Sequence, residues 1–182
     1  MGFQVDHIIK KCKEGCRQSQ KTFYMTFADD LMAVSIRYAS DINEAKDILQ
    51  NAFIKIFSQI STFDESKGSL KPWMSKIVVN EALQLIRKKK NVRFSQLELV
   101  HNMYAKEPDI FSQLSTEEIT AMIGKLPPGY KIVFNMYVIE GFSHKEISEH
   151  LGIAESASRS QLSRAKKLLQ ELIIQHKMFK VC

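Results

Sequence analysis

The side chains best suited to bind nucleic acid gather in one stretch of the sequence, from Lys67 to Arg93. The stretch holds eight basic residues and one acidic residue, Glu81, so it alone carries a charge of +7, whereas the rest of the chain sums to −1. A solvated helix face is the simplest explanation of such a run, but a basic cluster in an otherwise balanced chain is more often a binding surface for phosphates. This stretch therefore favours nucleic acid as a partner.

No comparable arrangement of residues points to catalysis. An enzyme of the usual kinds needs paired carboxylates, a cysteine with a histidine, or a phosphate-binding loop, and we find none of these. Glu44 and Asp47 are close in sequence, but they lie in a segment that we interpret below as a docking helix. The three cysteines, Cys12, Cys16 and Cys182, have the odd number and irregular spacing of reduced thiols and match no common metal site. We therefore predict no enzymatic activity, no cofactor and no metal.

Length and composition predict an all-α protein of two small domains. The chain has 182 residues, enough for two helical modules that each bury a modest core, and its 7 glycines and 4 prolines leave few turns for a many-stranded sheet. No apolar run approaches the roughly 20 residues of a membrane span, and the N-terminal segment lacks the apolar core of a signal peptide. We therefore expect the chain to work in the cytoplasm.

The clearest helical pattern runs from Ala45 to Ile60. One stripe at three- and four-residue steps is apolar and predicts a core face: Ala45, Ile48, Leu49, Ala52, Phe53, Ile56, Phe57 and Ile60. A second stripe lies on roughly the opposite face and comprises Asp47, Gln50, Asn51 and Ile54. An isoleucine among polar residues there indicates a docking surface for a partner helix, although a solvated face with one stray isoleucine fits equally well.

A second helix is expected after a loop at residues 61–69, with Pro72 in its first turn and its end near Lys90. Its buried side should comprise Met74, Ile77, Val78, Ala82, Leu85 and Ile86, which leaves Trp73, Lys76, Asn80, Leu83 or Gln84, and Arg87 on another side. An aromatic ring, amides and cations on one stripe are what melted nucleic acid requires. The alternative for Trp73 is a core anchor.

The C-terminal part, after an acidic linker, has the pattern of a helix-turn-helix. Ser115 with Glu118 and Ser143 with Glu146 are capping boxes that start helices, and residues 130–139 are expected to form another helix between them. The second box starts a short helix to Leu151, Gly152 ends it in the left-handed conformation, and a longer helix begins near Glu155. In that last helix Leu162, Ala165, Leu169 and Leu172 should face inward, and Ser156, Arg159, Ser160, Ser163 and Lys167 outward as candidate readers of a major groove.

Two sets of short motifs stand in order on either side of the linker. The first set is Asp41 to Phe53, with the spacing Asp-x-x-Gln-x-x-Phe, followed by Leu70 to Met74 with Asn80 and Arg87. The second set is Leu126-Pro127, Glu140 to Ser143, Glu146-Ile147, Leu151 to Ile153, and Arg159 to Ala165. Together they resemble the second and fourth conserved regions of the extracytoplasmic-function (ECF) class of sigma factors in the sigma-70 family, over about residues 23–172.

The resemblance implies a domain plan and three binding surfaces. Residues 1–91 would form the region 2 domain, 92–114 the linker, and 115–182 the region 4 domain. Residues that would dock core RNA polymerase are Asp47, Gln50, Asn51 and Ile54, with the clamp helices of the largest subunit and the flap as the polymerase contacts. Residues that would capture and melt the minus-ten element are Lys67, Trp73, Lys76, Asn80, Arg87 and Lys88. Residues that would bind the minus-thirty-five duplex are Ser156, Arg159, Ser160, Ser163, Arg164 and Lys167.

The resemblance also implies an anti-sigma partner, which could hold the chain at the inner membrane. Two departures from the family pattern bear on promoter choice: Ser156-Ala157-Ser158 stands where many relatives have Gly-Thr-Val, and Gln161 stands where arginine is frequent. The competing interpretation is a conventional helix-turn-helix regulator with a sensing or dimerising N-terminal half. The basic stretch and the docking stripe in that half argue against it.

Overall fold

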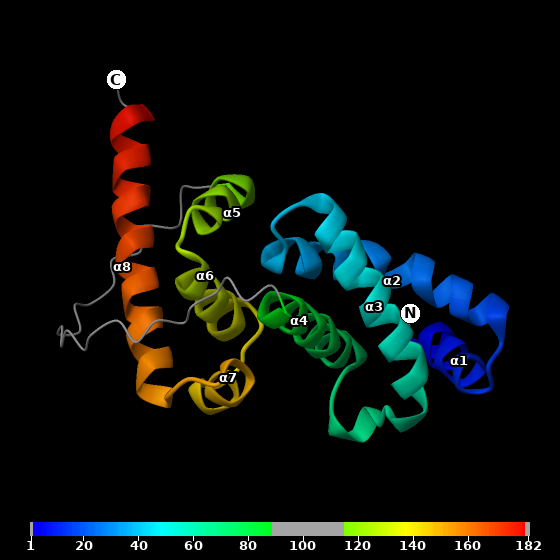
Figure 1. The fold of residues 1–182 in the computed structure, drawn as a ribbon. Coiled ribbons are helices and arrows are strands. Elements are labelled where there is room, and N and C mark those ends of the chain that lie inside the picture. Colours follow the sequence, from blue (N-terminus) through cyan, green and yellow to red (C-terminus); the bar gives the residue numbers. More distant parts are fainter. Residues whose placement is uncertain (1, 89–114, 181–182) are drawn as a thin grey trace. The chain divides into compact units, whose positions relative to one another are not determined.

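The computed structural model describes residues 2–88 and 115–180, and its regular elements are all helical in these ranges, which confirms the predicted all-α class. The chain divides into two compact units, Met1–Lys90 and Asn91–Cys182, and each is described here by itself (Figure 1). The predicted linker, residues 92–114, lies outside the described residues. Among the described helices, none is long and apolar enough to cross a membrane.

The first unit is a bundle in which α2 lies against the three other long helices. Its elements are α1 (Gly2–Lys13), α2 (Arg17–Tyr38), α3 (Ile42–Gln59), two short 3-10 turns, η1 (Ile60–Thr62) and η2 (Glu65–Lys67), and α4 (Leu70–Lys88). Helix α2 packs against α1, α3 and α4, and α3 also packs against α4. The two helices that carry the predicted docking and minus-ten residues, α3 and α4, are therefore direct neighbours.

Helix α3 begins where the sequence provides a cap. The Asp41 carboxylate accepts hydrogen bonds from the backbone N–H groups of Asn43 and Glu44, both at 2.9 Å, and Glu44 in return accepts from the backbone N–H of Ser40 at 2.7 Å. These bonds satisfy donors that the first helical turn leaves without partners. The predicted core stripe is buried at every position except Phe57, which is half-buried.

Helix α4 begins at Leu70, so Pro72 is the third helical residue and lies in the first turn, as the sequence predicts. Its buried side differs from the prediction at Leu85, which is half-buried. Leu83, one of two candidates for the outer side, is buried, whereas Gln84 is exposed. The reason is that α4 has neighbours on two sides, α2 and α3, so its apolar face is wider than one stripe.

The second unit consists of α5 (Thr116–Gly124), α6 (Pro128–Phe134), a π-helical segment η4 (Asn135–Ile139), α7 (His144–Leu151) and α8 (Glu155–Lys180). Both predicted capping boxes are present, Ser115 with Glu118 and Ser143 with Glu146. Helix α8 packs against α5, α6 and α7, and Leu162, Ala165 and Leu169 are buried as predicted. Leu172 is only half-buried, and Ile173 occupies the next buried position instead. The expected single helix over residues 130–139 is wrong in detail, because the chain changes to π-helical hydrogen bonding at Asn135.

Candidate nucleic-acid and partner interfaces

The predicted docking stripe is exposed along its whole length on α3. Asp47, Gln50, Asn51 and Ile54 are all solvent-exposed, and Ile54 leaves 62% of its surface uncovered. An isolated exposed isoleucine needs no explanation, but this one borders a larger apolar feature.

That feature is an open hollow of about 590 Å³ between α2 and α3. It is lined by Tyr24, Met32, Lys46, Leu49, Gln50, Phe53, Ile54 and Phe57. The Tyr24 ring lies 4.5 Å from that of Phe53, so an aromatic pair from the two helices forms part of the wall. Gln50 and Ile54 of the docking stripe thus line the same hollow as Tyr24 and Met32 of α2, which the sequence did not indicate as part of this surface. No local pattern in the sequence indicates that Tyr24 of α2 lies beside Phe53 of α3.

The predicted minus-ten residues occupy α4 and the turn before it. Lys76, Arg87 and Lys88 are exposed on α4, Asn80 is half-buried there, and Lys67 is exposed at the end of η2, 3.7 Å from the Asp64 carboxylate. The Trp73 ring is half-buried, and its centroid lies 5.2 Å from that of Phe63. Trp73 therefore combines features of both interpretations, because one part of its ring packs on Phe63 of the loop and the rest is exposed to solvent.

Glu81, the only acidic residue between Lys67 and Arg93, is buried. Glu81 is 8% exposed and forms an ion pair with Lys55 of α3, with 2.6 Å between the charged atoms. The exposed charged side chains of α4 are consequently all cationic: Lys71, Lys76, Arg87 and Lys88. Glu81 therefore does not reduce the charge of this surface, whereas the exposed Asp30 carboxylate of α2 pairs with Lys71 at 2.6 Å.

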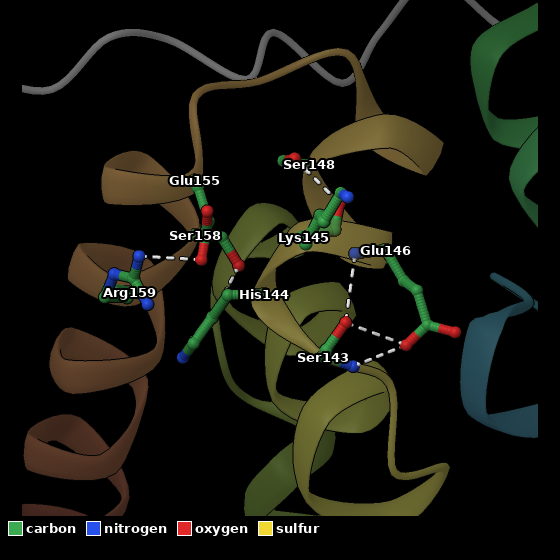
Figure 2. Close-up of polar contacts among 8 residues, drawn as sticks. All are labelled: Ser143, His144, Lys145, Glu146, Ser148, Glu155, Ser158 and Arg159. Atoms are coloured by element: carbon green, nitrogen blue, oxygen red, sulfur yellow. Dashed lines mark hydrogen bonds and ion pairs between the residues drawn. The ribbon is translucent and has the colours of Figure 1, made fainter.

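The helix-turn-helix of the second unit is formed by α7, the turn at Gly152 and α8. Gly152 has a φ of 65° and lies in the left-handed region, as the sequence predicts. On α8, Ser156, Arg159, Ser163 and Lys167 are exposed, and Ser160 and Arg164 are half-buried. Arg159 donates to the Glu155 carboxylate at 2.6 Å, four residues earlier on the same helix (Figure 2). The predicted reading residues thus share the outer face of one helix.

A polar contact joins the two helices of this motif. The Nδ1 atom of His144, the first residue of α7, lies 2.9 Å from the Ser158 hydroxyl in the first turns of α8 (Figure 2). The His144 ring also stacks on Tyr137, with 4.4 Å between centroids and 23° between planes. Burial and then the nearby Arg159 guanidinium lower the pKa of His144 below its usual value of 6.5, and Glu155 opposes this effect. Sequence reasoning missed this contact entirely.

Two family descriptions match the chain, in the order that these surfaces suggest. Sigma-70 region 2 matches residues 23–92, and Sigma-70, region 4 matches residues 116–169. The chain is 27% identical over 152 residues to the ECF RNA polymerase sigma factor SigM of Bacillus subtilis (strain 168), a match that covers 82% of this chain and 91% of SigM. It is 26% identical over 183 residues to SigW of the same strain, covering 94% of this chain and 97% of SigW.

Solved structures agree with these matches at the level of the fold. The sigma factor RpoE in complex with the anti-sigma factor NepR from Bartonella quintana has a TM-score of 0.53 at 24% identity, covering 84% of this chain and 95% of that one. CnrH in complex with the cytosolic domain of CnrY has a TM-score of 0.50 at 16% identity, covering 92% and 96%.

The helical fold with its two matched regions defines a two-domain transcription initiation protein. The chain belongs to the ECF class of the sigma-70 family of RNA polymerase sigma factors. It therefore directs promoter recognition by RNA polymerase and is not an enzyme, as the sequence predicts. A conventional helix-turn-helix regulator is not supported, because the N-terminal half matches region 2.

Proposed function

We propose that the chain binds core RNA polymerase through α3 and promoter DNA through α4 and α8. The observation that carries the proposal is the separation of three exposed surfaces of different chemistry: an apolar and polar stripe on α3, a cationic face on α4, and a face of serines and cations on α8. Each is one side of a helix whose other side is buried, so the fold presents them without rearrangement.

The polymerase contact is assigned to Asp47, Gln50, Asn51 and Ile54. Clamp helices of the largest polymerase subunit could insert an apolar side chain into the hollow beside Ile54 while polar groups pair with Asp47 and Gln50. The polymerase flap is the proposed contact of the second unit. The exposed side chains of Tyr137, Val138 and Ile139 support this assignment, because they form a continuous apolar segment there.

The minus-ten contact is assigned to Lys67, Trp73, Lys76, Asn80, Arg87 and Lys88. The solvent-facing part of the Trp73 ring provides a stacking surface, Asn80 an amide for a base edge, and the cations attract phosphates. Extruding a base costs a few kcal/mol, and stacking with pocket contacts returns about 1 to 3 kcal/mol per base. Binding energy alone can thus hold the strands apart, without hydrolysis.

The minus-thirty-five contact is assigned to Ser156, Arg159, Ser160, Ser163, Arg164 and Lys167. The early part of a recognition helix enters the groove, so Arg159 is placed to reach base edges, and Arg164 and Lys167 lie further along toward the phosphates. The half-buried position of Arg164 agrees with a positioning role.

We also propose an anti-sigma partner and a cytoplasmic site of action. The RpoE structure holds an anti-sigma factor, and the apolar hollow at Ile54 is a surface that such a partner could cover in place of polymerase. A chain that works on promoter DNA must meet it in the cytoplasm, either unbound or released from a partner at the inner membrane.

Reconstitution with core RNA polymerase tests the proposed function directly. The purified chain is mixed with core enzyme, and transcripts from fragmented genomic DNA are mapped to their start sites. We expect co-elution with core and start sites that share a minus-ten and a minus-thirty-five sequence, both absent with core alone. Failure to bind core, or initiation with no shared upstream sequence, would refute the proposal.

A further inference from the structure

His144 is held in one position by contacts on two sides. Its ring stacks on Tyr137 of η4, and its Nδ1 atom lies 2.9 Å from the Ser158 hydroxyl. The capping box of Ser143 and Glu146 fixes the backbone at the start of α7, where His144 is the first helical residue (Figure 2). The imidazole therefore has a defined direction and cannot turn away from α8 without losing the stack.

Ser158, the partner of His144 in this contact, is fully buried. A buried hydroxyl that loses its partner keeps its desolvation cost, so the bond with His144 favours one placement of Ser158 relative to α7. Ser158 is adjacent to Arg159 in sequence and lies within the first two turns of α8. Any shift of Ser158 is consequently a shift of the turn that carries Arg159.

We propose that His144 is a positioning residue for minus-thirty-five recognition, which sets the placement of the first turns of α8 through Ser158 and hence the direction in which Arg159 reaches the bases. The proposal rests on the proposed role of α8 in reading duplex DNA. His144 itself contacts no base in this mechanism.

The pairing is a feature of this chain's own sequence. The contact needs a polar side chain at position 158, because a valine there would have no polar atom to offer to His144. One of the departures noted in the sequence therefore has a partner fourteen residues away, on the other helix of the motif.

The charges around His144 favour its neutral form. Arg159 and Glu155 approach from α8, Tyr137 covers one ring face, and Lys145 and Glu146 follow on its own helix. Protonation would place a second cation near Arg159 and would compete with Arg159 for the Glu155 carboxylate. Burial and the nearby Arg159 guanidinium lower the pKa of His144, so its protonation requires a more acidic pH than that of an ordinary histidine.

The test is a double-mutant cycle in the polymerase holoenzyme. His144→Ala, Ser158→Ala and the double variant are compared with the unaltered chain for binding to a promoter with its own minus-thirty-five element and to one with that element scrambled. We expect each single variant to lower the ratio of the two affinities about fivefold, and the double variant to lower it no further. His144→Asn should restore the ratio to within twofold, because its amide places a polar atom close to the position of Nδ1.

Two further measurements separate positioning from general support of the fold. His150→Ala is the matched control, because it removes another histidine of α7 that packs on Phe142, with 5.5 Å between ring centroids. It should leave the affinity ratio unchanged. A pH titration continued into the acidic range should lower the ratio for the unaltered chain once His144 is protonated and leave it constant for His144→Asn.

The outcomes distinguish this inference from the proposed function. If the unaltered holoenzyme does not discriminate the two promoters, the proposed role of α8 fails. If it discriminates and His144→Ala does so equally well, or if the two substitutions have additive effects on the ratio, His144 is not a positioning residue. A loss of binding to both promoters by the same factor would also overturn the inference, since it would indicate only a weakened fold.

Discussion

Ile54 allows the docking face to be tested with a calculable magnitude. Its side chain is 62% exposed, and full burial of an isoleucine contributes about 1.5 to 3 kcal/mol, so a partner that covers the rest gains about 1 to 2 kcal/mol. Since about 1.4 kcal/mol is a tenfold change in affinity, Ile54→Ala should weaken binding to core polymerase roughly 5- to 30-fold. Ile54→Glu adds the cost of burying a carboxylate beside the aromatic wall of the hollow, and should weaken binding more than about 100-fold.

In the assay, core polymerase is titrated into fluorescently labelled chain, and binding is measured as the increase in fluorescence anisotropy. Ile54→Leu is the matched control, because it keeps an apolar side chain of the same volume and should bind within about threefold of the unaltered chain. Because Ile54 is exposed, each variant should retain its helical circular dichroism and lose no more than about 0.5 kcal/mol of stability.

One result would refute this reasoning. If Ile54→Glu binds core polymerase within twofold of the unaltered chain and remains folded, the stripe on α3 is an ordinary solvated face. The hollow beside it would then serve another purpose, and the assignment of Asp47, Gln50 and Asn51 to polymerase binding would fall with it.

Three other predictions concern DNA binding and thiol chemistry. Asn80→Ala should impair open-complex formation more than duplex binding, and unchanged permanganate reactivity of promoter thymines would contradict this. Arg159→Ala should flatten the preference at one or two minus-thirty-five positions, whereas Lys167→Ala should weaken binding evenly and make its salt dependence shallower; a promoter-library selection and a salt titration measure the two effects. A serine hydroxyl and backbone N–H groups at the start of α2 lower the pKa of Cys16, and burial raises that of Cys12, so iodoacetamide at neutral pH should modify Cys16 first. Peptide mass spectrometry would show equal rates if this reasoning is wrong.

Local features of the fold could be predicted because each depends on residues close in sequence. The stripe from Ala45 to Ile60 needs only helical periodicity, and the boxes at Ser115 and Ser143 need only a capping residue three positions before a glutamate. Gly152 marks its turn because a left-handed residue after a helix is most often glycine. The outer faces of α3 and α8 then follow, since a helix with one buried stripe must expose the opposite one.

The other features of the fold could not be predicted, because no local sequence pattern indicates which segments contact each other or where a helix changes its hydrogen bonding. The hollow exists because α2 brings Tyr24 beside Phe53 of α3, and nothing in either helix alone indicates that meeting. The contact of His144 with Ser158 spans a turn and two helix starts. The π-helical segment at Asn135 was not expected either, because residues 130–139 read as an uninterrupted helix.

The ion pair of Lys55 and Glu81 shows how such a distant contact bears on function. A pair with one buried member is a poor source of stability, because removing the carboxylate from water costs about as much as the attraction returns. Its effect is geometric. The pair ties α3, which carries the proposed docking face, to α4, which carries the proposed minus-ten face. Lys55 directly follows Ile54 in the sequence, and Glu81 directly follows Asn80. Polymerase bound at the first face and a melted strand bound at the second would therefore act on two helices held in one arrangement.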